Sequence, residues 1–192
     1  MLRFLLAISL FVCFNLGAQP DAALSGQLRQ GGFVLYLRHA STDLSQNDAK
    51  MSSYEDCAHQ RNLTDRGRAE ARTLGEHLKR LKIPIGSVLA SPFCRTMETA
   101  RLAFGKAQPM QEVRGGPSRT DDAKRYEGLR KLLSTPVPKG ENLVISSHGN
   151  PFHAVAGPPY LAEGEMAVVQ PQGDSTFAVV GRIRLEEWEL LQ

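Results

Sequence analysis

The sequence predicts an α/β fold, a three-layer αβα sandwich whose central sheet is mainly parallel and ends in antiparallel C-terminal strands. First, the apolar run at 33–37 and the segment 141–150 lack the alternation of half-exposed strands, as expected for a sheet covered on both faces. Second, helical patterns separate the predicted strands, and such alternation produces layered α/β sheets. Third, two strand-like segments near the C-terminus follow one another with only a turn between them, which favours antiparallel pairing.

Composition indicates one globular domain. The chain has 192 residues, of which 42% are hydrophobic and 22% charged, enough to bury a core. The formal net charge of +3 suits an anionic substrate. Because the sequence has no lysine-rich run and no alternation of basic with aromatic residues, we do not expect a nucleic-acid partner.

The first 18 residues have the layout of a secretory signal peptide. Arg3 precedes an apolar stretch that runs to Phe14, and the small residues Gly17 and Ala18 follow. We therefore expect export, to the periplasm or the medium, and a mature domain covering 19–192 without stable membrane association. An uncleaved membrane anchor is the alternative.

The elements follow in order from a glycine pair. Gly31-Gly32 begins the first strand, at 33–37, and a polar loop extends from Ser41 to about residue 62. Thr64 or Asp65 can cap the helix that follows, and Pro84 ends it. Its apolar face is marked by residues at helical spacing, namely Ala71, Leu74, Leu78 and Leu81.

A second strand is predicted at 85–90, followed by a helix that Ser91 caps, with Pro92 at its first position and Gly105 after its end. Residues 106–118 are predicted to be loop, and 121–133 a helix. The third strand lies within 141–150, and a loop containing glycine and proline follows it. The final strands are 166–171 and 176–185, with 170–175 as their connection.

Cations and imidazoles stand where three predicted strands end. Arg38 and His39 end the first strand, Arg95 lies in the first turn of the helix after the second, and His148 ends the third. Ligands of open α/β sheets bind outside the carboxyl ends of the strands, so we expect these side chains to converge. Guanidinium groups match phosphate oxygens, and a neutral imidazole is a nucleophile toward phosphorus.

Three segments, "LRHAST", "SPFCRTMETA" and "ISSHGN", resemble the signature blocks of the histidine phosphatase superfamily, whose fold is shared with the cofactor-dependent phosphoglycerate mutases. The resemblance implies that His39 is the nucleophile that becomes phosphorylated. It also implies that Arg38, Arg95 and His148 complete a phosphate pocket. The expected partner is a phosphorylated small molecule, with neither a cofactor nor a metal.

The first block departs from the family pattern, which usually has glycine where Ala40 stands. A left-handed backbone is costly for alanine, so we expect a negative φ at this position. Ser41 and Thr42 replace the acidic or amide residues of the mutases, which weakens a mutase interpretation. The Thr42 hydroxyl is expected to bind a phosphate oxygen.

The resemblance also implies a general acid in the loop after the second block. Glu112 lies in that region and is favoured, although its surroundings, "QEVRGG", match poorly. Glu163 and Glu165, which follow the second histidine, are rivals. Such an acid would protonate the leaving oxygen and then activate water.

Removal of the signal peptide leaves two cysteines, Cys57 and Cys94. Export makes a disulfide between them possible, and two free thiols are the alternative.

The sequence therefore predicts an exported, metal-independent phosphatase that hydrolyses phosphomonoesters through a phosphohistidine on His39. One alternative is a non-catalytic protein that binds phosphate or a phosphorylated glycan. A binder needs cations and not a nucleophile, so the two histidines argue against it. The other alternative is a phosphatase that acts on phosphohistidine in proteins, which export disfavours.

Overall fold

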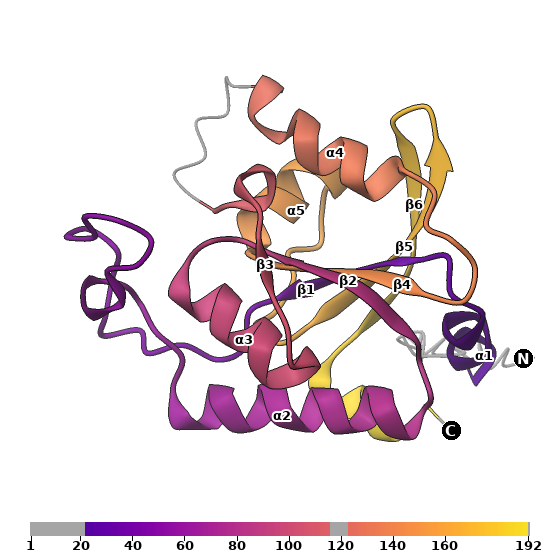
Figure 1. Ribbon diagram of the computed structural model, residues 1–192, viewed down its shortest axis with the longest axis horizontal. Helices are drawn as coiled ribbons and strands as arrows, with labels where there is room; N and C mark the ends of the chain where they lie inside the picture. The colour runs from indigo at the N-terminus through magenta and orange to yellow at the C-terminus, as the bar shows by residue number, and fades with distance from the viewer. Residues whose placement is uncertain (1–21, 116–122, 192) are drawn as a thin grey trace, which may run out of the picture.

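The computed structural model describes residues 22–115 and 123–191 and confirms the predicted fold class: a mixed six-stranded sheet with helices on both faces (Figure 1). The sheet order is β3-β2-β4-β1-β5-β6. The strands are β1 (Val34–Arg38), β2 (Ile85–Ala90), β3 (Gln108–Pro109), β4 (Asn142–Ser147), β5 (Met166–Gly173) and β6 (Thr176–Ile183). Strands β1 to β4 pair in parallel, whereas β5 pairs antiparallel with both β1 and β6.

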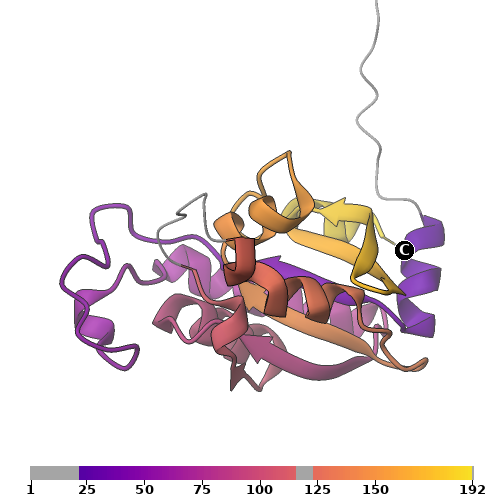
Figure 2. The same ribbon diagram turned by 90° about the horizontal axis from the view of Figure 1, so that it is seen from above.

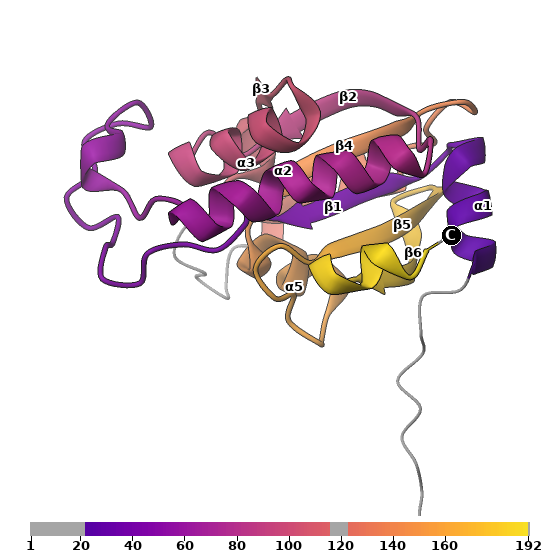
Figure 3. The ribbon, with the colours of Figure 1, turned by 90° about the horizontal axis from the view of Figure 1, so that it is seen from below.

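Helices cover the two faces of the sheet as separate layers (Figures 1 and 3). The α-helices are α1 (Ala22–Gln30), α2 (Asp65–Arg80), α3 (Cys94–Phe104), α4 (Glu127–Ser134) and α5 (Gly149–Ala156). Leu35 and Leu37 of β1 join one buried cluster with residues of α1, α2 and α3. Val34 and Tyr36 join a second cluster with residues of α4 and α5. This alternation follows from strand geometry, since successive side chains point to opposite faces.

The helix starts differ in how well the sequence predicted them. Thr64 caps α2, because its side chain accepts a hydrogen bond from the backbone N–H of Gly67. The predicted start of α3 is wrong: the helix begins at Cys94, with Phe93 as its N-cap residue. Ser91 bonds His148 instead of capping the helix. Gly105 ends α3 in the left-handed conformation, as a helix C-terminus favours.

Two segments near the C-terminus also differ from the prediction. Residues 149–156 form α5, although 149 and 150 were expected in the third strand segment and 151–156 in a loop. Pro151 is compatible with α5 because proline is tolerated in the first turn of a helix. The connection predicted at 170–175 is mostly strand, and only Asp174 and Ser175 form the turn. Both have positive φ, which matches the right-handed twist of a tight hairpin.

A long loop, 39–64, leaves the carboxyl end of β1 and projects from the body of the molecule before α2 begins (Figures 1 and 2). A disulfide between Cys57 and Cys94 ties this loop to the start of α3, with the two Cα atoms 5.7 Å apart. The predicted signal peptide, 1–18, lies outside the described residues. Of the helices that the structure describes, none has the length and apolar character to span a membrane.

Candidate active site

The sheet brings the two predicted histidines together. β1 and β4 are parallel neighbours, with Arg38 opposite Ser147, so His39 and His148 leave adjacent strand ends. Their rings are 5.4 Å apart between centroids, in an edge-to-face arrangement. The main-chain N–H of His39 donates to Ser147, which continues the strand pairing and fixes the position of the first ring.

The hydrogen bonding of His39 decides which of its nitrogens can react. Nδ1 lies 3.0 Å from the carbonyl oxygen of Ala40. A carbonyl only accepts, so Nδ1 carries the proton and donates it to this bond. Nε2 therefore keeps its lone pair, as a nucleophilic imidazole requires. Ala40 is not among the described residues with positive φ, in agreement with the expectation for this turn.

Burial and positive charge keep both imidazoles neutral. Only 1% of His39 is exposed, and this burial lowers its pKa to about 3, with the charges of Arg95 and Arg38 acting in the same direction. Burial likewise lowers the pKa of His148 well below its usual value, and the charges of the nearby arginines add to the effect. A hydrogen bond of 2.8 Å joins Nε2 of His148 to the Ser91 hydroxyl.

Arg38 is held from the loop that follows α5. Its Nη1 donates to the carbonyl oxygen of Leu161 at 2.6 Å, and its Nη2 lies 3.5 Å from Glu163. The guanidinium carbon lies 5.3 Å from the ring centre of Tyr160. These contacts fix a permanent cation beside the nucleophile.

Arg95 makes a two-pronged ion pair with a residue of the long loop. Its Nη1 and Nη2 donate to the two carboxylate oxygens of Asp48, at 3.0 and 3.1 Å. Nη1 also donates to the carbonyl oxygen of Arg61, at 3.2 Å. The guanidinium carbon lies 4.7 Å from the ring centre of Phe93. Arg95 is thus buried and strongly oriented.

A pocket of about 470 Å³ joins these side chains and is large enough for a small metabolite. Its walls include His39 and His148 together with three cations, Arg38, Arg61 and Arg95. The Nε atoms of these arginines are buried and have no hydrogen-bond partner within the described part of the chain. An unpaired buried donor is costly, so an anion in this pocket would be stabilised.

The structure does not bring every predicted site residue into the pocket. Glu112 lies beside a separate cavity of about 520 Å³, with its side chain against Gly128 of α4. The Thr42 hydroxyl donates to Glu163 at 2.7 Å instead of facing the pocket. Glu163 forms an ion pair with Arg38. Glu165 is buried and accepts a hydrogen bond from the backbone N–H of Ala162.

Sequence reasoning missed several residues that line the pocket, among them Asp48, Gly115 and Tyr160. A Cβ atom on Gly115 would come within 2.6 Å of the His148 ring, so this glycine allows the backbone to pack against the second histidine. Asp48 and Tyr160 lie in loops, where hydrophobic periodicity gives no information on side-chain direction. Among the residues that the structure describes, there is no cluster of three or more potential metal ligands.

The arrangement is an anion pocket at the carboxyl edge of a mixed sheet, with a neutral imidazole flanked by guanidinium groups. This sheet and its helical layers have the fold of the histidine phosphatases. Residues 34–115 match the family model of the histidine phosphatase superfamily (branch 1). The matched segment includes Arg38, His39 and Arg95, whereas His148 lies beyond it and is brought to the site by the sheet.

Several solved structures share this fold at low sequence identity. The protein histidine phosphatase SixA complexed with tungstate is 21% identical, with a TM-score of 0.53, over 80% of this chain and 97% of that chain. A mutant phosphoserine phosphatase from Entamoeba histolytica, in complex with phosphoserine, is 11% identical, with a TM-score of 0.55. The match covers 81% of this chain and 98% of that chain. A mycobacterial glucosyl-3-phosphoglycerate phosphatase with inorganic phosphate is 16% identical, with a TM-score of 0.52. The match covers 72% of this chain and 89% of that chain. No curated protein matches the sequence significantly.

Proposed function

We propose that the protein is an exported phosphatase that hydrolyses phosphomonoesters through a phosphohistidine on His39, without a metal or a cofactor. The observation that carries this proposal is the hydrogen bond from Nδ1 of His39 to the Ala40 carbonyl, which leaves Nε2 unprotonated beside the arginines of the pocket. A protein that only binds phosphate has no need of such a nucleophile.

In the proposed first step, Nε2 of His39 attacks phosphorus and a P–N bond forms while the ester P–O bond breaks. The leaving oxygen takes the electron pair and gains a proton from solvent water. Arg38 and Arg95 stabilise the charge on the transferring phosphoryl oxygens, a contribution that in other phosphoryl-transfer enzymes amounts to a factor of about 10³ to 10⁵. In the second step, water attacks phosphorus, the P–N bond breaks, and neutral His39 and inorganic phosphate are released.

The carboxylates predicted from the sequence do not line the pocket. Glu112 faces another cavity, Glu163 accepts a hydrogen bond from Thr42, and Glu165 accepts one from the backbone of Ala162. None of the three is placed to protonate a leaving oxygen in the pocket. We therefore expect the rate to depend strongly on the leaving group, with aryl phosphates hydrolysed much faster than alkyl phosphates.

The test is hydrolysis of 4-nitrophenyl phosphate in the presence of a chelator, by the mature domain and by its His39→Ala variant. The proposal predicts turnover by the mature domain and its loss in the variant. Undiminished turnover in the variant would reject His39 as the nucleophile. Inactivity of the wild type on many substrates, combined with phosphate binding, would indicate the binding protein instead. Export is tested separately, by the N-terminus of the protein recovered outside the cytoplasm.

A second candidate is a phosphatase acting on phosphohistidine in proteins. It is favoured by the absence of Glu112 from the pocket, because an imidazole leaving group needs less help from an acid than an alkoxide. The similarity of the fold to that of SixA, a protein histidine phosphatase, also favours this second candidate. Hydrolysis of a phosphohistidine-containing peptide at a higher kcat/KM than that of 4-nitrophenyl phosphate would favour this candidate.

A further inference from the structure

Asp48 is an acidic residue in a pocket otherwise built to hold an anion. Within the described ranges it is the only carboxylate that lines this pocket. Its two carboxylate oxygens accept hydrogen bonds from the two terminal nitrogens of Arg95, at 3.0 and 3.1 Å. Oδ1 also accepts from the backbone N–H of Arg61, at 2.9 Å. A carboxylate in this fork makes the same paired bonds that a phosphoryl group would make.

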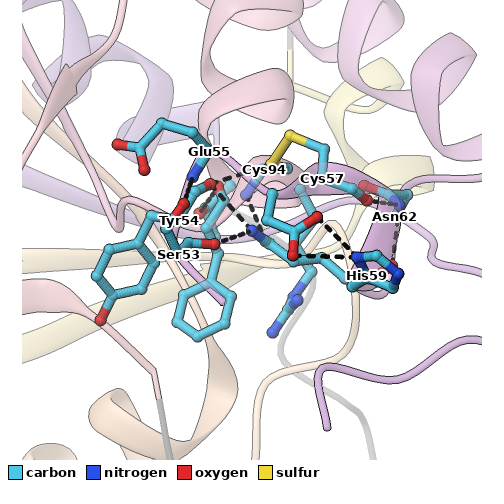
Figure 4. Close-up of a disulfide and its surroundings, with 12 residues drawn as sticks. Ser53, Tyr54, Glu55, Cys57, His59, Asn62 and Cys94 are labelled. Carbon is cyan, nitrogen blue, oxygen red and sulfur yellow. Dashed lines mark hydrogen bonds and ion pairs between the residues drawn. A yellow bond between two sulfur atoms is a disulfide. The ribbon is translucent and has the colours of Figure 1, made fainter. Parts of the chain in front are cut away.

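The loop that carries Asp48 is fastened to the helix that carries Arg95. Cys57 of the loop is bonded to Cys94, the residue immediately before Arg95 (Figure 4). Beside the disulfide, the buried Gln60 side chain accepts from the backbone N–H of Cys94 and donates to the carbonyl of Tyr54. These bonds anchor the second half of the loop to the start of α3, so the pairing of Asp48 with Arg95 is made by a loop that is tied down and does not move freely.

We propose that Asp48 is an internal anion that occupies the Arg95 fork and is exchanged for the phosphoryl group of a substrate. Asp48 thereby sets the affinity of the pocket for phosphate, and for the phosphate product in particular. The inference rests on the proposed function, since it assigns Arg95 to phosphate binding. It adds a residue that opposes binding to those that favour it.

The physical argument is one of competition and charge. A phosphoryl group that uses Nη1 and Nη2 of Arg95 must break two charge-assisted hydrogen bonds to Asp48. If the carboxylate stays near, it repels the dianion. Replacement of Asp48 by asparagine keeps the size of the side chain and one acceptor oxygen but removes the negative charge, so phosphate binding should become tighter.

The experiment measures the binding of inorganic phosphate by calorimetry in four forms of the mature domain: wild type, Asp48→Asn, Arg95→Ala and the double variant. Glu55→Gln is the matched control, because Glu55 is an exposed residue of the same loop outside the pocket (Figure 4), and its change removes the same charge. We expect Asp48→Asn to bind phosphate at least about fivefold more tightly than wild type. Glu55→Gln should bind as wild type does, and the gain from Asp48→Asn should vanish when Arg95 is alanine.

Three results would overturn the inference. Weaker phosphate binding by Asp48→Asn would show that Asp48 serves to position Arg95. An equal gain in the Arg95→Ala background would show a general charge effect. A loss of kcat on alkyl phosphates alone, with binding unchanged, would make Asp48 a proton donor. Failure of the proposed function is distinguishable, because the wild type would then not hydrolyse 4-nitrophenyl phosphate, whatever phosphate affinities the calorimetry gives for the wild type and Asp48→Asn.

Discussion

Glu163 lies behind Arg38, with its Oε1 atom 3.5 Å from Nη2 of the arginine. The same oxygen accepts from the Thr42 hydroxyl at 2.7 Å and lies 3.9 Å from Nδ1 of His39. A loop that follows α5 thus supports the residues at the end of β1, 125 positions earlier in the chain. The carboxylate is placed to orient the cation and, in the proposed mechanism, to stabilise the positive charge that the imidazole would gain when Nε2 bonds phosphorus.

Glu163→Gln should therefore lower kcat by about 10- to 100-fold, the size expected when a hydrogen bond to a charged group is lost, with a smaller change in KM. Glu112→Gln is the comparison, because it changes a carboxylate of the same length outside the pocket. It should leave steady-state kinetics on 4-nitrophenyl phosphate unaltered. If the two substitutions exchanged these effects, Glu112 would be the functional acid and the positioning role of Glu163 would be wrong.

We expect that lysine cannot replace the arginines of the pocket. Arg95→Lys keeps the charge but loses the planar fork, so kcat/KM should fall by about 10²- to 10³-fold. Arg66→Lys, on the exposed side of α2, provides the same chemical change away from the site and should have no effect. Kinetics on one aryl phosphate suffice as the measurement. Full activity of Arg95→Lys would show that the geometry of the guanidinium is not used.

The disulfide should support both stability and substrate binding. Cys57 and Cys94 close a loop with a sequence separation of 37, so the double alanine variant should lose about 3–4 kcal/mol of unfolding free energy in the chain-entropy model. Because the loop carries Arg61 and Asp48 to the pocket, KM should change as well. Urea unfolding and kinetics, with and without a reducing agent, provide the measurements. A reducing agent that weakened the variant as much as the wild type would exclude the disulfide as the cause.

Acid should destabilise the fold through His39. Burial lowers the pKa of His39 in the folded state to about 3, whereas an unfolded histidine titrates near 6.5. The unfolded chain therefore binds the proton first, and stability is lost as the pH falls from about 6.5 towards 3. His39→Gln should lose less unfolding free energy than wild type between pH 7 and pH 4.5, measured by urea unfolding. An equal loss in both proteins would mean that His39 is not held neutral by the fold.

The predicted residues that follow strand ends are the ones that the structure brings together. Because β1 and β4 are adjacent and parallel, the residues that follow them meet at one edge, and the positions of His39 and His148 follow from this rule. The direction of a loop side chain has no such rule. Glu112 was favoured from its place in the chain, yet a short 3-10 helix turns it towards α4.

In the fold, too, periodic segments could be predicted from the sequence, whereas features set by tertiary contacts could not. Periodicity located the core strands and α2, whose apolar face is continuous. The predicted start of α3 was wrong. Ser91 and Pro92 favour a helix start locally, but Ser91 instead makes a tertiary hydrogen bond to His148. Asp48 was missed because its pairing with Arg95 joins positions 47 residues apart, and the polar loop that carries Asp48 has no periodic signal.

The central claim is that phosphorus becomes bonded to His39, and rapid quenching tests it most directly. Mature protein mixed with a ³²P-labelled aryl phosphate is stopped within milliseconds in alkali, digested and mapped by mass spectrometry. The account predicts a label that is stable in alkali and labile in acid, located on His39, formed and lost at rates compatible with turnover, and absent from His39→Ala. Steady turnover without a labelled enzyme, or a label on His148 that persists in His39→Ala, would contradict it.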